Sequence, residues 1–164
     1  MVKNLFLIRH AFALPAGQNQ RDFNRRLSET GRKQSVILGG YLKNLGTPIQ
    51  AIYTSPSLRT LETAAQLLPQ LDEKPRIIEA EEYYNATRNL MMASLNRLDD
   101  LFDTVCVIAH NPAVSEAFSY LTGDYGRGFG EATCAWLQLP IEEWSMISSG
   151  LAEVKDYYYP GRSI

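Results

Sequence analysis

The chain has 164 residues, of which 45% are hydrophobic and 21% charged, and its formal net charge is −2. This length and apolar share predict one globular domain over residues 1–164, large enough to bury a sizeable core. A net charge so close to zero gives no support to nucleic acid or to an anionic membrane surface as a partner.

Too few apolar residues precede Arg9 to form the core of a signal peptide, and no later run is long enough to cross a bilayer. We therefore expect a cytoplasmic protein with no membrane partner. Cys106 and Cys134 both lie in apolar, strand-like runs, where a free thiol acts as a small hydrophobic side chain. Two cysteines in a chain of this length do not predict a disulfide framework.

The first predicted element is a short strand, Leu5-Phe6-Leu7-Ile8, that should be buried on both faces and that runs directly into Arg9 and His10. In an open α/β sheet the ligand crevice lies beyond the carboxyl ends of the strands. Arg9 and His10 would therefore reach the place where ligands bind. A lone Arg-His pair is more often an ordinary surface feature, so the prediction depends on whether the pattern is repeated.

The pattern is repeated after a second apolar strand, residues 51–54. Ser55 and Pro56 follow this strand and are typical of the N-cap and the first position of a helix. We therefore predict that Arg59 lies in the first turn of that helix, at the same edge of the sheet as Arg9.

A third strand, residues 104–109, ends at His110, and Asn111 with Pro112 again predicts a helix N-cap followed by a proline. The chain has only two histidines, and each directly follows a predicted strand. The three strand ends should therefore bring two arginines and two histidines to one crevice.

The other elements are predicted from caps, breakers and apolar periodicity. In chain order they are a polar loop over residues 11–24, a helix capped by Ser28 and ended by Gly46, a helix over 57–68, a strand over 76–79, a helix over 86–98, a helix that follows His110 and is stopped by Gly123, a loop over 123–130, and strands over 132–139 and 151–159. This alternation of strands and helices predicts an α/β fold: a single domain with a mainly parallel central sheet and helices on both faces.

With these residues the sequence resembles the histidine phosphatase (phosphoglycerate mutase-like) superfamily, and within it the small SixA-type phosphohistidine phosphatases. The blocks that carry the resemblance appear in family order and are Leu7-Ile8-Arg9-His10, Arg25-Arg26-Leu27-Ser28-Glu29-Thr30-Gly31, Thr54-Ser55-Pro56-Ser57-Leu58-Arg59-Thr60, Glu82-Tyr83-Tyr84-Asn85-Ala86 and Ala109-His110-Asn111-Pro112. The family usually has glycine after the Arg-His pair, where this chain has Ala11.

Phosphoryl transfer needs a nucleophile in line with the leaving atom and fixed positive charge on the non-bridging oxygens. We predict His10 as the nucleophile, with one ring nitrogen attacking phosphorus while the other donates to a neighbouring group and fixes the tautomer. Arg9 and Arg59 suit the oxygens, because a guanidinium stays charged and binds two oxygens at once. His110, if protonated, would add a further donor and charge.

The resemblance implies two more site residues. Arg25 falls where the family carries a further substrate-binding arginine, although it also fits a solvated loop residue. Glu82 falls near the position at which larger relatives keep the carboxylic acid that protonates the leaving group, and the neighbouring Glu79 and Glu81 make its assignment less specific. A SixA-like protein would act on a phosphohistidine-bearing protein, such as a phosphotransfer domain, and would bind phosphate or a similar anion in its pocket.

Other phosphatase chemistries do not fit the sequence. It lacks the Cys-x5-Arg, Asp-x-Asp, Gly-Lys and Gly-x-Ser-x-Gly patterns of cysteine phosphatases, haloacid-type phosphatases, P-loop proteins and esterases. Cys106 and His110, four residues apart on a strand, would lie roughly 13 Å apart, too far to share a metal ion. We therefore expect a metal-independent phosphatase without a cofactor. Hydrolysis of small phosphomonoesters and a non-catalytic phosphate-binding module remain as alternative functions.

Overall fold

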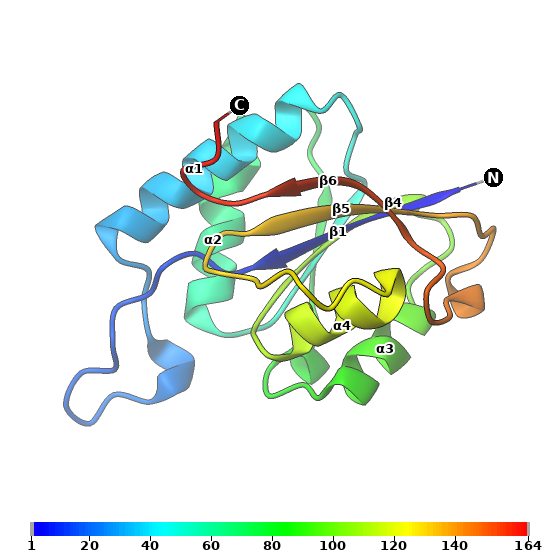
Figure 1. The fold of residues 1–164 in the computed structure, drawn as a ribbon. Helices are drawn as coiled ribbons and strands as arrows, with labels where there is room; N and C mark the ends of the chain where they lie inside the picture. Colours follow the sequence, from blue (N-terminus) through cyan, green and yellow to red (C-terminus); the bar gives the residue numbers. More distant parts are fainter. Residues whose placement is uncertain (1, 164) are drawn as a thin grey trace.

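The computed structural model describes residues 2–163 (Figure 1). One sheet contains the strands β1 (Lys3–Arg9), β2 (Ala51–Thr54), β3 (Arg76–Glu79), β4 (Thr104–Ala109), β5 (Cys134–Leu139) and β6 (Glu153–Tyr158). Their order across the sheet is β3-β2-β4-β1-β5-β6. The pairs β3/β2, β2/β4 and β4/β1 are parallel, whereas β1/β5 and β5/β6 are antiparallel. The predicted α/β fold with a mainly parallel sheet is therefore confirmed.

Helices cover both faces of this sheet. They are α1 (Glu29–Asn44), α2 (Leu58–Leu67), α3 (Arg88–Asn96) and α4 (Ala113–Thr122). In Figure 1, α1 and α2 lie on one side of the sheet and α3 and α4 on the other. Leu5 and Leu7 of β1 belong to the apolar core under α3 and α4, and Phe6 and Ile8 belong to the core under α1 and α2, because side chains alternate along a strand. The predicted burial of β1 on both faces is thus confirmed.

The pairing of β1 with β4 brings the two histidines together. Arg9 lies opposite Ala109 in the parallel register, and the N–H of His10 donates to the carbonyl of Ala109 at 3.1 Å. His10 and His110 therefore leave adjacent strands at the same level. The N–H of Ser55, which follows β2, donates to the carbonyl of Ile108 at 3.1 Å. All three predicted strand ends thus meet at one edge of the sheet, beyond which the loop over residues 11–24 extends (Figure 1).

The two predicted N-caps are wrong by one or two residues. Helix α2 begins at Leu58 with Ser57 as its cap, because Ser55 is still paired to β4 and extends the strand. Helix α4 begins at Ala113, and its cap is Pro112 rather than Asn111. The hydroxyl of Ser55 therefore also contacts His110, and the amide of Asn111 also donates to the carbonyl of Phe129.

Three predicted elements, two strands and one helix, are shorter than predicted. The strand expected over 132–139 begins at Cys134, because Ala132 has a left-handed backbone with φ 57° and turns the chain. The N–H of Ala132 lies 3.1 Å from the carbonyl oxygens of both Arg9 and His10. The segment before β5 is therefore held directly against the end of β1. The strand expected over 151–159 is β6, and the helix expected over 86–98 is α3, each shorter at both ends.

Both cysteines are buried and free, and burial raises the pKa of each thiol, which agrees with their predicted role as small hydrophobic side chains. None of the helices within residues 2–163 combines the length and the apolar character that a membrane span needs.

Helix α1 is capped by Ser28 as predicted, since the Ser28 hydroxyl accepts the N–H of Gly31 at 2.9 Å. Farther along, α1 packs closely on the end of α2. A Cβ atom added to Gly39 would lie 2.6 Å from the carbonyl oxygen of Leu67, whereas one added to Gly40 would meet no atom within 4 Å. Gly39 thus sets the distance between α1 and the helix that carries Arg59.

We predict opposite effects for two adjacent substitutions in α1. Gly39→Ala should lower the free energy of unfolding by about 1–3 kcal/mol, because the new methyl group collides with the backbone of α2. Gly40→Ala should raise it by about 0.5–1 kcal/mol, because alanine loses less entropy in a helix and has room here. Urea denaturation of the two variants measures both values, and a stabilised Gly39→Ala would contradict this packing.

Candidate active site

His10 lies at the floor of the site, where only 7% of its surface is exposed. Its Nδ1 lies 2.7 Å from the carbonyl oxygen of Ala11. Because a carbonyl only accepts, Nδ1 carries the ring proton, and the lone pair of Nε2 is left for chemistry. The predicted fixing of the tautomer by a neighbouring carbonyl agrees with this contact.

Arg59 reaches the same point from the first turn of α2. Its Nε lies 3.4 Å from His10 Nε2, and its Nη2 lies 3.3 Å from His110 Nδ1. The Arg59 side chain is only 7% exposed, and its guanidinium is also held by Asp22, through the carbonyl oxygen at 2.8 Å and the carboxylate at 3.1 Å. Arg59 therefore presents positive charge beside the nitrogen that would attack phosphorus.

Arg9 and Arg25 add positive charge on the other sides of His10. Arg9 Nη1 donates to the carbonyl of Phe129 at 3.1 Å, and its buried Nε has no hydrogen-bond partner within the described residues. A buried N–H without a partner is costly, and an anion in the pocket is the kind of group that would satisfy it. Arg25 donates to the carbonyl of Leu14 at 2.9 Å and to the Asp22 carboxylate at 3.2 Å.

His110 is held by the end of β2. Its Nε2 lies 2.8 Å from the hydroxyl of Ser55, and its Nδ1 faces Arg59. Since a guanidinium only donates, Nδ1 accepts and Nε2 carries the proton that is donated to Ser55. The ring centroids of His10 and His110 lie 5.2 Å apart.

Both histidines are neutral near physiological pH. Burial is the main cause, and it lowers the pKa of His10 to about 4, with the charges of Arg59, Arg9 and Arg25 acting in the same direction. Burial also lowers the pKa of His110 to about 3, with further contributions from His10 and Arg59. A neutral His10 is the form that can act as a nucleophile. The charged His110 considered from the sequence is disfavoured by the same surroundings.

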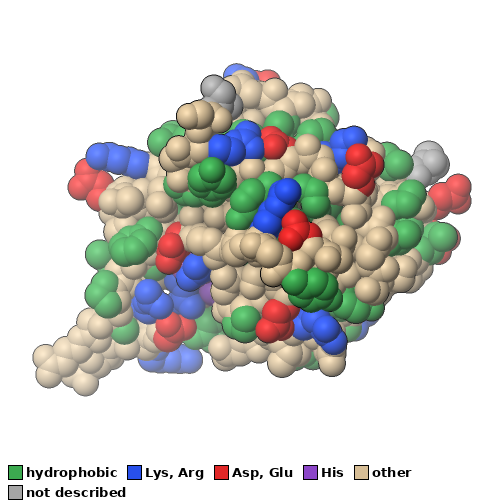
Figure 2. Space-filling model, in the orientation of Figure 1, with side chains coloured by type: hydrophobic (Ala, Val, Ile, Leu, Met, Phe, Trp, Pro, Cys, Tyr) green, Lys and Arg blue, Asp and Glu red, His purple; other side chains and the backbone are tan. Residues whose placement is uncertain are grey.

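A pocket of about 430 Å³ opens above these groups. Five of the six predicted site residues line it: Arg9, His10, Arg25, Arg59 and His110. Its other lining residues are Phe12, Ala13, Pro15, Asn111 and Glu131. Figure 2 shows basic side chains gathered around this hollow, with a histidine visible between them.

Glu82 is not part of this group. It lies in the short 3-10 turn Glu81–Tyr83 and accepts the hydroxyl of Ser94 at 3.3 Å, in a separate hollow of about 340 Å³ that also contains Arg97. The family position of Glu82 therefore does not bring its carboxylate to His10 in this structure.

Two carboxylates at the site had no signal in the sequence, because Asp22 lies in a single 3-10 turn and Glu131 in a turn before β5, neither of which carries a motif. Asp22 is bound by Arg59, Arg25 and Tyr84, the last through its hydroxyl at 2.8 Å. Partial burial raises the pKa of Asp22, but the hydrogen bonds from Tyr84, Arg25 and Arg59 outweigh it and lower the value to about 2. The second carboxylate, Glu131, lines the pocket beside Arg9.

Ala11 stands where the family usually has glycine. Its N–H donates to the hydroxyl of Thr63 at 3.1 Å, and its side chain packs with Leu27 and Ala132 in a small buried cluster. The alanine methyl group is thus accommodated in the protein interior. Its N–H is engaged within the protein instead of facing the pocket.

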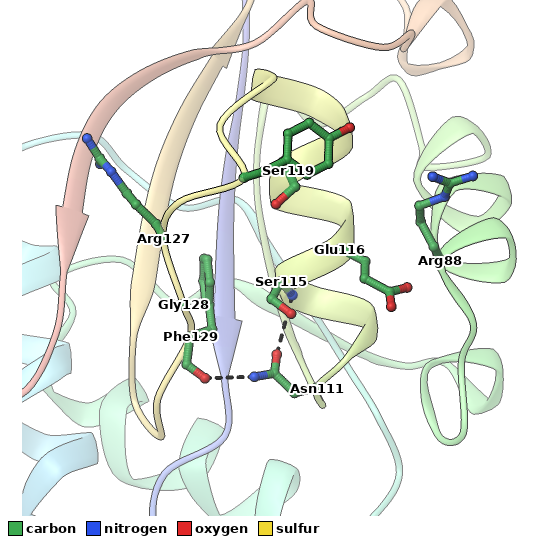
Figure 3. A pocket seen from close by; sticks show the side chains of 9 residues that line it. Arg88, Asn111, Ser115, Glu116, Ser119, Arg127, Gly128 and Phe129 are labelled. Carbon is green, nitrogen blue, oxygen red and sulfur yellow. Dashed lines mark hydrogen bonds between the residues drawn. The ribbon is translucent and has the colours of Figure 1, made fainter.

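A second hollow, of about 550 Å³, lies beside the first and shares Asn111 with it. Figure 3 shows that Asn111 bridges α4 and the 123–130 loop. Its side chain donates to the carbonyl of Phe129 at 2.7 Å and accepts the N–H of Ser115 at 3.3 Å. Arg88 of α3 and Arg127 of the loop flank this hollow (Figure 3). The site is therefore continuous with a larger polar surface.

Residues 2–163 contain no group of three or more His, Cys, Asp or Glu side chains arranged to hold a metal ion. Independence from metal ions stays a prediction.

The family model of the histidine phosphatase superfamily (branch 1) matches residues 5–84, which include Arg9, His10, Arg25 and Arg59. One similar protein is the mitochondrial serine/threonine-protein phosphatase Pgam5 of Drosophila erecta, 24% identical over 167 residues that cover 93% of this chain. The chain spans only 57% of the length of that relative. An uncharacterized protein of Mycobacterium tuberculosis, Rv1276c, is 23% identical over 148 residues, which cover 85% of this chain and 91% of that protein.

Solved structures share the fold. The candidate phosphohistidine phosphatase SixA from Agrobacterium tumefaciens superposes with a TM-score of 0.83 and 21% identity, over 96% of this chain and 98% of that one. The protein histidine phosphatase SixA in complex with tungstate gives a TM-score of 0.79 and 23% identity, over 94% and 95% of the two chains. The chain thus shares its fold with these structures, and the part of it that carries Arg9, His10, Arg25 and Arg59 matches the model of the histidine phosphatase superfamily.

We predict that neither histidine titrates in the usual range. Because His10 has a pKa of about 4 and His110 of about 3, both rings should stay neutral from pH 7 down to about pH 5. Imidazole NMR signals measure this directly, since the chain has only two histidines and the variants His10→Gln and His110→Gln assign the two spectra. A midpoint near 6.5 for His10 would contradict the proposed protonation state.

The lowered pKa of His10 also determines the direction in which the stability of the fold changes with pH. Unfolded histidine binds a proton below about pH 6.5, whereas the folded His10 does so only below about pH 4. The contribution of this group to stability is therefore fully present above pH 6.5 and is lost as the pH falls toward 4. Denaturation measured over this pH range should show that the free energy of unfolding falls less in the His10→Gln variant than in the parent.

Proposed function

We propose that this protein is a member of the histidine phosphatase superfamily, a metal-independent phosphatase that carries the phosphoryl group on His10 and acts on phosphohistidine in a partner protein. The observation that carries the proposal is the state of His10. Its Nδ1 proton is bound by the Ala11 carbonyl, so the Nε2 lone pair points at Arg59 in a pocket lined by three arginines.

In the first step the phosphoryl oxygens bind Arg9, Arg25 and Arg59, and His10 Nε2 attacks phosphorus. A new P–N bond forms on His10 while the P–N bond of the substrate breaks, and its electron pair returns to the substrate ring. A substrate imidazole that is protonated on its other nitrogen leaves as a neutral ring. This step therefore needs no acid from the enzyme.

In the second step water attacks the phosphorus held on His10. An O–P bond forms, the P–N bond breaks, and its electron pair returns to Nε2, which restores the neutral ring with its proton on Nδ1. The Ala11 carbonyl stabilises the positive charge of the phosphorylated ring, because it accepts from Nδ1 at 2.7 Å. Inorganic phosphate is released.

Two features favour a phosphohistidine substrate over a phosphomonoester. The carboxylate expected to protonate an alkoxide, that of Glu82, faces a separate hollow, and a P–N bond has no such requirement. Phe12, which lines the pocket, is 46% exposed, and Leu14, two residues further along the same loop, is 49% exposed. Exposed apolar groups beside a polar pocket suit contact with a protein surface better than contact with a small sugar phosphate.

Related proteins suggest other substrates that an assay has to include. One relative is named as a serine/threonine-protein phosphatase, and a protein of the same fold, 14% identical with a TM-score of 0.68, is a glucosyl-3-phosphoglycerate phosphatase. Phosphoserine in a protein and small phosphomonoesters are therefore the competing substrate classes. A non-catalytic phosphate-binding module is the remaining alternative.

We predict that His10→Ala abolishes turnover and leaves the fold intact. The side chain ends in the pocket, so its removal costs little core packing while it removes the nucleophile. Incubation of the parent with 32P-labelled substrate should label the protein with a phosphate that is lost in acid and stable in alkali, as a phosphoramidate is. Full activity of His10→Ala would rule out this mechanism, and a parent that neither turns over nor becomes labelled would be a binding module.

We predict that kcat/KM is highest for a phosphohistidine-bearing phosphotransfer domain. The panel for comparison contains a phosphohistidine peptide, a phosphoserine protein, and sugar and nucleotide monophosphates. Each rate is measured with and without a chelator, and the rates should agree because the arginines supply the positive charge. If a monoester is hydrolysed more efficiently than the phosphohistidine protein, the small-molecule function replaces this one. Activity that a chelator removes and magnesium or zinc restores would refute metal independence.

A further inference from the structure

We propose that Glu131 is the general base of the second step, accepting the proton of the water that hydrolyses phosphohistidine at His10. This inference rests on the proposed function and adds a catalytic residue to it. The second step needs such a group, because the attacking water must lose a proton as the O–P bond forms.

The position of Glu131 is the first argument. Within the described part of the chain, it is the only carboxylate among the residues that line the His10 pocket. Its Oε1 lies 3.4 Å from Arg9 Nη2, next to the guanidinium that would bind a phosphoryl oxygen. A water molecule bound to this carboxylate would therefore lie beside the phosphorylated His10.

The backbone holds Glu131 in this place. The next residue, Ala132, has the left-handed conformation that non-glycine residues rarely adopt, with φ 57°. Its N–H lies 3.1 Å from the carbonyls of Arg9 and His10, and the N–H of Arg9 donates to the carbonyl of Thr133 at 3.1 Å. Strained backbone of this kind persists where surrounding bonds impose it, and it is concentrated at functional sites. Glu131 is thus fixed to the two residues that bind and carry the phosphoryl group.

The surroundings of Glu131 suit a base. The side chain is 36% exposed, so its carboxylate has solvent access, and it forms an ion pair with the guanidinium of Arg9. An ionised carboxylate accepts a proton readily and is a poor acid. Its charge therefore matches the second step and not the first, in which the substrate imidazole leaves without help.

The other candidate groups are engaged elsewhere. The Asp22 carboxylate already accepts from Arg25, Arg59 and Tyr84. His110 donates its one proton to Ser55 and accepts from Arg59. Glu131 retains free acceptor capacity at the pocket, since a carboxylate offers about four lone-pair sites and Arg9 takes one of them.

The proton balance is complete without a further reactant. The water oxygen forms a bond to phosphorus, one water proton moves to a carboxylate oxygen of Glu131, and the electron pair of the breaking P–N bond returns to His10 Nε2. Inorganic phosphate leaves, and the Glu131 carboxyl group then gives its proton to solvent.

The test separates the two steps by rapid quench with 32P-labelled phosphoramidate as the phosphoryl donor. Glu131→Gln keeps an oxygen that can accept from Arg9 but cannot take a proton. We expect the labelled enzyme to form at the parent rate and to be hydrolysed roughly 100-fold more slowly, so that it accumulates. In Glu131→Ala, added formate should restore part of the hydrolysis rate, because it can occupy the space of the missing carboxylate.

The matched control is Glu153→Gln, which removes an ion pair of the same length, 3.4 Å to Lys155, on β6 away from the pocket. It should change neither step. Equal slowing of both steps in Glu131→Gln would show that Glu131 only orients Arg9, and an unchanged hydrolysis rate would show that it has no role; either result overturns the proposal. If the parent itself forms no labelled enzyme, the proposed function is wrong as well. This outcome is seen in the parent protein without any variant, so it differs from a failure of the Glu131 proposal alone.

Discussion

The parallel pairing of β1 with β4 is the constraint on which the site depends. Arg9 lies opposite Ala109, so His10 and His110 leave the sheet side by side, and Ser55 is bonded to the same strand. A slip of one residue would turn Phe6 and Ile8 into the core under α3 and α4, and Leu5 and Leu7 into the core under α1 and α2, where they do not fit the existing packing. Because β1 is packed on both faces, the register that forms the core also fixes the distance between the two histidines.

Electrostatics at this edge of the sheet follow from the same arrangement. Three arginines meet beside the buried imidazole of His10 and the partly buried imidazole of His110, and the charge and burial together keep both rings neutral. Asp22 binds Arg59 and Arg25, and Glu131 pairs with Arg9, so each cation has a carboxylate that holds it in place. A nucleophile with a free lone pair is therefore compatible with a strongly cationic pocket, which is the combination that phosphoryl transfer requires.

The sequence was most informative where local pattern decides the structure. Short apolar strands ending in Arg9, His10 or His110 were recognisable because burial, strand ends and chemistry coincide within a few residues. The N-cap predicted at Ser55 was wrong because hydrogen bonding to β4 overrides the local preference for a cap. Asp22 and Glu131 lie in short turns, where the direction of a side chain depends on contacts with residues far away in the chain. The family pattern led to Glu82, but the turn that carries it directs its carboxylate toward Ser94.

The loop over residues 11–24 combines two roles that are usually separate. It carries Asp22, which orients Arg59, and it also carries two exposed apolar side chains, Phe12, which lines the pocket, and Leu14. Backbone contacts hold the loop to the rest of the fold near its start. Ala13 forms an isolated antiparallel β-bridge with Leu27, and the N–H of Leu14 donates to the carbonyl of Arg26 at 2.8 Å. A partner protein that packs on Phe12 and Leu14 would thus contact the segment that positions the arginine beside the nucleophile. Recognition of a protein surface and alignment of the phosphate-binding charge would then depend on the same few residues, which a free phosphomonoester is too small to engage.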